Sequence, residues 1–302
     1  MRITNNMLSH NLLRNLGAAQ GRMDSLQNQL SSGNRITRPS DDPVGIENGL
    51  RIKSSISHVE QWKANASEGL AYMKTTDTFL GDMTLMLQRA EELAVQGSNE
   101  SNAPDDRNKI ALEIHQIKEQ MVELANTRVG SKYIFGGTAN QEPFPKGSTK
   151  GSDWQGSDDI VKFQVGSSLS LEISVNGKQL FGVTTTPPDP DSVGMFQTLD
   201  DLEKALTSSD TAGIQMSIGA LETQADNVVN YRAQLGARQN RMESIYSQLD
   251  STALNLTESL SNIMDADIAK TLVDFKTQES VYQAALSVGA KIIQPSLVDF
   301  MR

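Results

Sequence analysis

Residues 211–264, TAGIQMSIGALETQADNVVNYRAQLGARQNRMESIYSQLDSTALNLTESLSNIM, decide the fold of this chain. Apolar side chains recur there with a strict seven-residue period, at Leu221, Val228, Leu235, Met242, Leu249, Leu256 and Ile263. An apolar seam sustained at this spacing is typical of a coiled-coil helix. At 1.5 Å per residue the helix would be about 80 Å long, which is longer than a compact globular core. We therefore predict a rod-like bundle rather than an ordinary amphipathic core helix.

Other stretches carry comparable seams. Residues 57–95 hold one whose members alternate by four and three positions: Trp62, Ala66, Gly69, Met73, Thr76, Leu80, Met83, Leu87, Ala90 and Ala94. A third helix is expected to open at Pro104 and to be closed by Gly130. Helical seams joined by short polar turns indicate an elongated antiparallel bundle.

The connector before the second helix has a clear start signal. Asp42 is the expected N-cap, with Pro43 at the first helical position. Residues 43–56 contain two glycines, so we expect only moderate helicity there and a more regular helix from about residue 57.

The pattern changes after Phe135. Apolar and polar residues alternate in 160–165 and 169–175, which predicts half-buried strands. The dipeptide Asn176-Gly177 is typical of a two-residue hairpin turn. A proline-rich segment at 187–190 then ends the insertion, and a short helix is expected before residue 211. The fold class is therefore mainly α with a small inserted β domain.

Both ends of the chain are predicted to be amphipathic helices. The first, 3–31, should stop at Gly33, and its seam is spaced by four and three: Leu12, Leu16, Ala19, Met23, Leu26 and Leu30. The last helix is less regular, because Ile268, Leu272 and Phe275 share one phase while Val281, Ala285, Val288 and Ile292 share a shifted one. Lone helices of this length are marginal in water, so we expect both to be disordered in the free monomer and ordered between subunits.

Composition excludes several classes of protein. The net charge is −10 and the isoelectric point about 4.9, which argues against nucleic acid as the main partner. The sequence contains no run of 18 apolar residues, so no membrane span is predicted. It also lacks a continuous apolar stretch near the N-terminus, so no cleavable signal peptide is predicted. Cysteine is absent, so disulfides, thiolate metal sites and cysteine nucleophiles are excluded.

No catalytic constellation is present in the sequence. His10, His58 and His115 are isolated and show no HxxxH or HExxH spacing. Acidic pairs such as Asp41-Asp42 and Asp265/Asp267 match no calcium loop and stand where helix starts favour acids. We therefore expect no enzyme, no cofactor and no metal site.

Two terminal segments resemble bacterial flagellins. They are LQNQLSSGNRITRPSDDPVGIENGLRIKSSI at 26–56 and SLSNIMDADIAKTLVDFKTQESVYQAALSVGAKIIQPSLVDFMR at 259–302, with the DADIA element at Asp265–Ala269. Within that family, GSKYIFGGT at 130–138 and the short insert are most similar to the hook-associated branch at the hook–filament junction. The similarity spans nearly the whole chain except the insert.

The resemblance implies a three-part organisation. Residues 1–33 and 268–302 would form the inner coiled-coil tube of an axial filament. Residues 34–135 and 196–267 would form the α-helical rod around it, and 136–195 would be the outer β domain. Family members of this kind are exported unfolded by the flagellar type III apparatus, with a dedicated chaperone holding their C-terminal helices.

The function implied is that of a secreted adaptor at the hook–filament junction, which templates flagellin polymerisation. Its partners would be the first hook-associated protein, flagellin, and copies of itself in a helical ring. The predicted subunit-interface residues are Leu12, Leu16, Met23, Leu26, Leu30, Ile268, Leu272, Phe275, Val281, Val288 and Ile292. Pairing of the two terminal helices with each other stays an open alternative for these residues.

Other functions also stay open. A minor flagellin would differ from a junction adaptor in its location in the organelle. An exported tip or effector protein with a coiled-coil rod would not need both terminal helices. An extracellular hydrolase carried on the insert is disfavoured because residues 136–195 contain no histidine.

Overall fold

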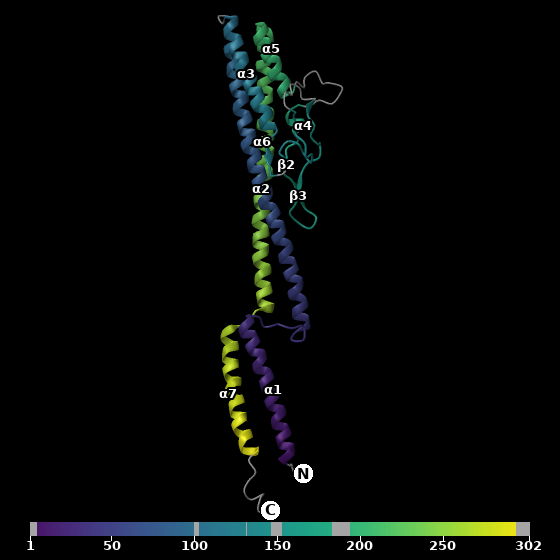
Figure 1. The fold of residues 1–302 in the computed structure, drawn as a ribbon, viewed down its shortest axis with the longest axis vertical. Helices are drawn as coiled ribbons and strands as arrows, with labels where there is room; N and C mark the ends of the chain where they lie inside the picture. Colours follow the sequence, from purple (N-terminus) through teal and green to yellow (C-terminus); the bar gives the residue numbers. More distant parts are fainter. Residues whose placement is uncertain (1–4, 100–102, 131, 146–152, 183–193, 294–302) are drawn as a thin grey trace, which may run out of the picture. The chain divides into compact units, whose positions relative to one another are not determined.

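A computed structural model of the chain describes residues 5–99, 103–130, 132–145, 153–182 and 194–293 (Figure 1), with the backbone alone given at 5, 6, 8 and 291–293. The residues group into two compact units, Met1–His58 with Ser251–Arg302, and Val59–Asp250, which we describe separately. The described part is mainly helical with two small antiparallel hairpins, which confirms the predicted fold class. None of the helices in the described ranges is long and apolar enough to cross a membrane.

The first unit contains the two terminal helices. Helix α1 spans Asn5–Ser32 and packs along helix α7, Ile268–Ile293 (Figure 1). Gly33 follows α1 with φ of +73°, the left-handed conformation that was predicted. The Asp42 carboxylate accepts the backbone N–H of Gly45 at 2.9 Å and so caps helix α2, which begins at Pro43 as predicted.

The prediction of only moderate helicity in residues 43–56 is wrong. Helix α2 runs without a break over Pro43–Ser98, so no weaker helix precedes the regular one. Gly49 lies against another helix: a Cβ there would stand 2.7 Å from the sulfur of Met264. The glycine therefore permits a close approach, and packing outweighs its low helix propensity.

In the second unit, the apolar seams form the core. Helix α6, Thr211–Met264, has the bounds that the sequence predicts, and its seam positions from Leu221 to Leu249 are buried. The predicted seam of α2 is buried from Ala66 to Ala94. Helix α3, Pro104–Ala125, packs on helix α5, Met195–Ser208.

The chain between residues 125 and 180 differs from the prediction in two places. Helix α3 ends at Ala125, and Gly130 lies in the tight turn between strands β1, Arg128–Val129, and β2, Lys132–Tyr133. The predicted hairpin turn at Asn176-Gly177 is wrong. Asn176 instead caps helix α4, Gly177–Leu180, because its side-chain oxygen accepts the backbone N–H of Lys178 at 2.9 Å.

The insert does contain a hairpin, but with shorter strands. Strand β3, Lys162–Gln164, pairs antiparallel with β4, Ser170–Glu172, with Phe163 opposite Leu171. The predicted alternation is present only in part: Leu171, Ile173 and Val175 are buried, but so is Ser174, whose hydroxyl oxygen accepts the backbone N–H of Val161 at 2.9 Å. The proline segment at 187–190 lies outside the described residues.

An aromatic cluster joins the insert to α5. The rings of Phe144 and Phe196 lie 4.8 Å apart, those of Phe144 and Phe181 5.0 Å, and those of Phe135 and Phe181 5.5 Å. All four rings are fully buried. The Tyr72 hydroxyl on α2 donates to the carbonyl of Ile134 at 3.0 Å, so the start of the insert is also fixed to the long helix.

A buried charge network connects α3 to α5. The ammonium of Lys118, a residue only 6% exposed, lies 3.0 Å from an Asp200 carboxylate oxygen and 2.7 Å from one of Glu203. Burial opposes the charged form, but hydrogen bonds to Glu203 and Asp200 outweigh it and raise the pKa of Lys118. Burial likewise opposes the Asp200 carboxylate, and hydrogen bonds from Lys204 and Lys118 outweigh it and lower its pKa.

We predict that Lys118→Met destabilises the chain by about 2 kcal/mol, because it leaves the Asp200 carboxylate buried with Lys204 as its remaining partner. The matched control is Lys109→Met on the same helix. Lys109 pairs with Asp106 at an exposed site, so its loss should cost about 0.5 kcal/mol or less. Urea unfolding of both variants measures the difference, and equal stabilities would contradict the role given to the buried network.

The same network predicts a pH dependence. A lowered Asp200 pKa stabilises the fold above its unfolded value of 3.8 and loses that effect as pH falls through the folded value. A raised Lys118 pKa stabilises it below 10.5 and loses that effect as pH rises through the folded value. The stability difference between wild type and Lys118→Met should therefore be constant from about pH 5 to about pH 9 and narrow below pH 3.8. Unfolding curves across that range test this.

Candidate subunit interface

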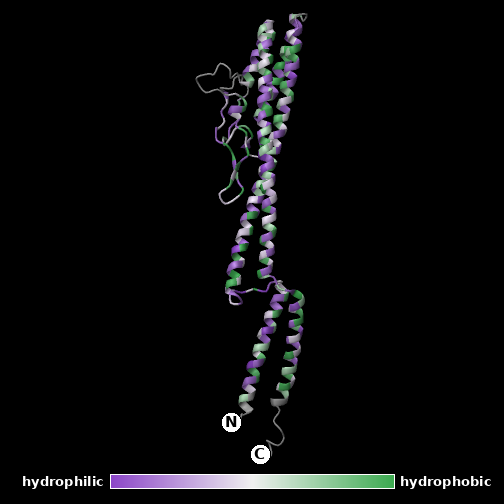
Figure 2. Ribbon diagram, turned by 180° about the vertical axis from the view of Figure 1, so that it is seen from behind, coloured by the Kyte–Doolittle hydropathy of each residue, from purple (hydrophilic) through white to green (hydrophobic). Residues whose placement is uncertain are grey.

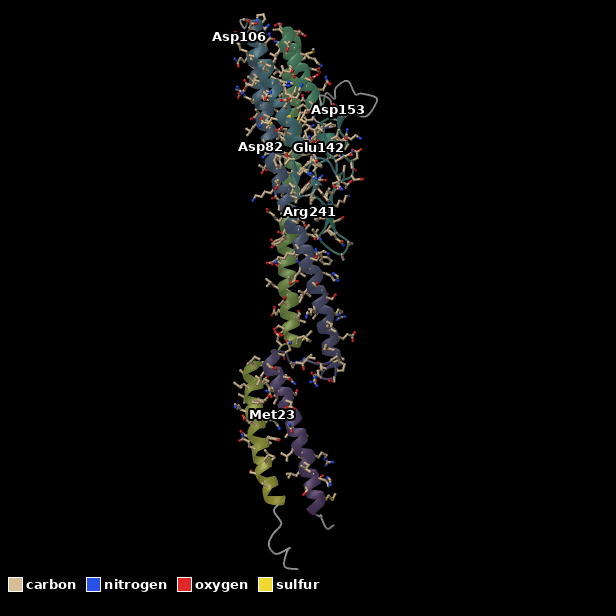
Figure 3. The ribbon with its side chains drawn as sticks, viewed as in Figure 1. Met23, Asp82, Asp106, Glu142, Asp153 and Arg241 are labelled. Atoms are coloured by element: carbon tan, nitrogen blue, oxygen red, sulfur yellow. The ribbon has the colours of Figure 1, made fainter. Side chains whose placement is uncertain are left out.

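The predicted seam of α1 faces α7. Ala19 is buried and the five predicted interface residues of α1 are half-buried along the same stripe: Leu12, Leu16, Met23, Leu26 and Leu30. Figure 3 marks Met23 in this seam. In the described monomer these residues are therefore used for pairing of the two terminal helices, the alternative that the sequence left open.

The seam of α7 is not the one expected from its apolar residues. The residues turned to α1 recur by four and three, at Thr271, Phe275, Gln278, Tyr282, Ala285 and Gly289. Gln278 donates its side-chain N–H to the carbonyl of Ala19 at 3.4 Å, and a Cβ at Gly289 would meet Leu12 at 2.7 Å. Polar and small residues thus fill most of this seam, and Phe275 alone of the predicted interface residues belongs to it.

The other predicted residues of α7 are exposed. Ile268 is 48% exposed, Leu272 49%, Val281 50% and Val288 52%. The backbone of Ile292 lies in α7, but its side chain is outside the described residues. Leu286 and Val273, which the sequence reasoning missed, are also exposed. Figure 2 shows apolar residues distributed along both terminal helices.

Five of these exposed residues lie on two flanks of α7, whereas Val273 lies roughly opposite the seam. At ~100° per residue, Ile268, Leu272 and Leu286 fall roughly 60–100° to one side of the seam. Val281 and Val288 fall roughly 80–100° to its other side. The apparent phase shift within this helix is therefore the signature of two apolar flanks on either side of a seam of mostly polar or small residues. A helix that is apolar on several sides is one that is buried on several sides.

Two backbone segments pair at the point where α1 ends and α7 begins. We call Gly33–Arg35 together with Met264–Ala266 the terminal joint. Asn34 and Asp265 form an isolated antiparallel bridge. The N–H of Arg35 donates to the carbonyl of Met264 at 2.6 Å, and the N–H of Ala266 donates to the carbonyl of Gly33 at 2.9 Å.

Acidic residues cap the helix ends around this joint. Asp267 accepts the backbone N–H of Lys270 at 3.0 Å and so caps α7. Asp41 accepts the N–H groups of Arg38, at 2.8 Å, and Thr37, and these bonds lower the pKa of its carboxyl group. Asp41, Asp42 and Asp267 thus have structural roles, and no cluster of three metal-ligating side chains occurs within the described ranges.

Comparison with known proteins matches both ends of the chain. Residues 3–140 match the family model for the bacterial flagellin N-terminal helical region. Residues 218–301 match the one for the bacterial flagellin C-terminal helical region. The unmatched residues between them include the β3–β4 hairpin, α4 and α5.

Individual relatives span nearly all of the chain. Flagellar hook-associated protein 3 of Escherichia coli is 27% identical over 94% of this chain and 95% of that protein. A flagellin of Halalkalibacterium halodurans is 27% identical over 97% of this chain and 96% of that protein. The crystal structure of Bacillus cereus FlgL superposes with a TM-score of 0.58 at 25% identity, over 70% of this chain and 99% of that chain. The chain therefore belongs to the bacterial flagellin family.

Proposed function

We propose that this chain is the adaptor at the hook–filament junction, where it templates the polymerisation of flagellin. As a member of the flagellin family it is a structural component of the bacterial flagellum. The observation that carries the proposal is the pair of apolar flanks on α7, which are exposed in the monomer although the helix is already paired with α1.

The physics of the terminal helices favours growth from a template. Two helices of this length, paired only with each other, gain little from burial and are marginal in water. Adding a subunit must order them, and burial of the α7 flanks against neighbours can supply that free energy. Spontaneous polymerisation is then slow, whereas addition to an existing tip is favoured. We therefore propose that the α1–α7 pair is only marginally stable in the free monomer, so that the terminal helices are disordered much of the time and become fully ordered between subunits.

Sequence identity alone does not separate an adaptor from a minor flagellin, because the relatives of both kinds are about equally similar. The likeness to Bacillus cereus FlgL supports the junction role, since it covers 99% of that chain at 25% identity. The minor-flagellin alternative has less support.

The remaining parts of the proposal concern partners and location. The first hook-associated protein and flagellin would lie on either side of a ring of these subunits. An export chaperone would bind the C-terminal helices before secretion, and the protein would leave the cytoplasm without a cleaved signal peptide. We also propose that it is no enzyme, because its relatives are structural proteins.

The first prediction concerns cells that lack this protein. Flagellin should be exported and shed into the medium as monomer, while hooks remain intact and bare. Comparing flagellin in the medium with flagellin in cell-attached filaments measures this. If filaments of normal attachment still form and only their number or shape changes, the protein is a minor filament subunit instead.

The second prediction concerns the flanks of α7. Leu272→Asp should change the free energy of unfolding of the monomer by about 0.5 kcal/mol or less, because Leu272 is half exposed, yet it should block filament attachment. Ser280→Asp is the matched control, since it adds the same charge to α7 at an exposed position away from the two flanks. A Leu272→Asp variant that still supports attached filaments would remove this flank from the interface.

A further inference from the structure

The alignment of α1 with α7 is weakly specified by the seam between them. The α7 side has two large side chains in this seam, Phe275 and Tyr282, and its other four residues are polar or small: Thr271, Gln278, Ala285 and Gly289. The polar and small residues pack almost equally well when one helix slides along the other, so on α7 only Phe275 and Tyr282 offer large side chains that resist a slip. A slip would matter for assembly, since it rotates or shifts the exposed flanks that neighbouring subunits must meet.

The terminal joint removes this freedom. It lies where α1 ends and α7 begins, and it pairs backbone segments that are about 230 residues apart in the chain. Its two backbone hydrogen bonds fix residue 34 opposite residue 265. Because α1 ends and α7 begins at this point, the pairing sets the alignment of the two helices along their length.

Arg35 is the side chain that closes the joint. Its guanidinium donates to the carbonyl of Ile263 at 2.8 Å, one of the carbonyls that the end of α6 leaves without a helical partner. The positive charge there also faces the negative end of the helix dipole. The same guanidinium lies 3.6 Å from the Asp42 carboxylate, which caps α2. One side chain thus contacts the end of α6 and the cap of α2.

The connector around Arg35 is organised to hold it. The carbonyl of Arg35 accepts the side-chain N–H of Gln29 on α1 at 3.1 Å. Ile36, the next residue, is 2% exposed, so the backbone that carries Arg35 is fixed by burial. Arg35 is therefore linked to α1, α2 and α6 within one unit.

We infer that Arg35 is a positioning residue for assembly: by closing the terminal joint it fixes the alignment of α1 with α7, and so the placement of the flanks that bind neighbouring subunits. The inference rests on the proposed function for its biological consequence. Its structural part, closure of the joint by Arg35, stands independently. The competing explanation is that Arg35, which is half exposed, contacts a neighbouring subunit directly.

The chain offers a direct probe of joint closure because it contains no cysteine. Asn34→Cys with Asp265→Cys places two thiols on bridge partners, and their oxidation to a disulfide reports how often the joint is closed. The pair is introduced into the full-length protein alone, with Arg35→Met, and with Arg38→Met. Arg38 is the matched control, because its bond to Asp41 comes from its backbone N–H, which the substitution retains.

We expect Arg35→Met to slow disulfide formation roughly tenfold, the factor that corresponds to losing one hydrogen bond from a charged group. Arg38→Met should leave the rate unchanged. If the disulfide forms as fast in the Arg35→Met variant as in the cysteine-pair protein that retains Arg35, Arg35 does not close the joint. The inference is then overturned, whatever the protein does in the cell.

The second readout is filament attachment in cells. Arg35→Met should reduce attached filaments, and the same variant carrying the cysteine pair should recover them when the medium is oxidising, because the disulfide replaces the missing side chain. Recovery supports a positioning role, since a disulfide cannot replace a contact with a neighbour. If the disulfide forms but filament attachment does not recover, the positioning role is overturned and Arg35 contacts a neighbouring subunit directly. If filaments attach without this protein at all, the proposed function fails, and the oxidation rates alone decide the inference.

Discussion

The packing of one apolar stripe per helix is the constraint on which this structure depends. A helix with a seven-residue apolar period can bury only a narrow face, so it needs a partner along its length rather than a round core. In α6 the stripe runs through Leu221, Val228, Leu235 and Met242, all buried in the second unit. Arg232, four residues after Val228, stands at the edge of this stripe, where its guanidinium lies 3.1 Å from the Asp77 carboxylate on α2. A charged residue can therefore stand beside the apolar stripe when it is paired with a charge on the facing helix.

The terminal unit meets the same constraint with a different result. The α1 seam is satisfied by α7, but α7 carries more apolar surface than one partner can cover. Four of its six seam residues are polar or small, whereas Leu272, Val281 and Val288 remain about half exposed. A sequence optimised for a stable monomer would place those apolar residues against α1. The observed distribution instead leaves them for contacts outside the chain, so intramolecular pairing and an inter-subunit role occur on different faces of one helix.

Much of this was predictable because the signals are local and repeated. The seam of α2, the bounds of α6 and the cap at Asp42 follow from periodicity and helix-end chemistry, which depend on residues within a few turns. The predictions that were wrong depended on contacts between segments that are distant in the chain. Asn176-Gly177 fits a hairpin turn and a helix cap equally well in sequence, and the close approach of the Phe135 carbonyl to Gly177 accompanies the cap. The glycines of residues 43–56 predicted a weak helix because the packing of Gly49 against Met264 is not visible in the sequence.

The candidate subunit interface on α7 was predicted only in part, because it too depends on contacts between distant segments. Periodicity identified the apolar residues of α7 but could not tell which of them face α1, because the apolar residues lie on both flanks and the seam itself is mostly polar or small. The terminal joint gave no sequence signal, since its bridge partners Asn34 and Asp265 are distant in the chain. Yet the joint explains why the two signature segments meet: each supplies one half of a pairing, together with the caps of the helices that leave it. Helices that are individually marginal can be aligned by a short, well-bonded segment at their common end, and their remaining apolar surface can then be buried by neighbours.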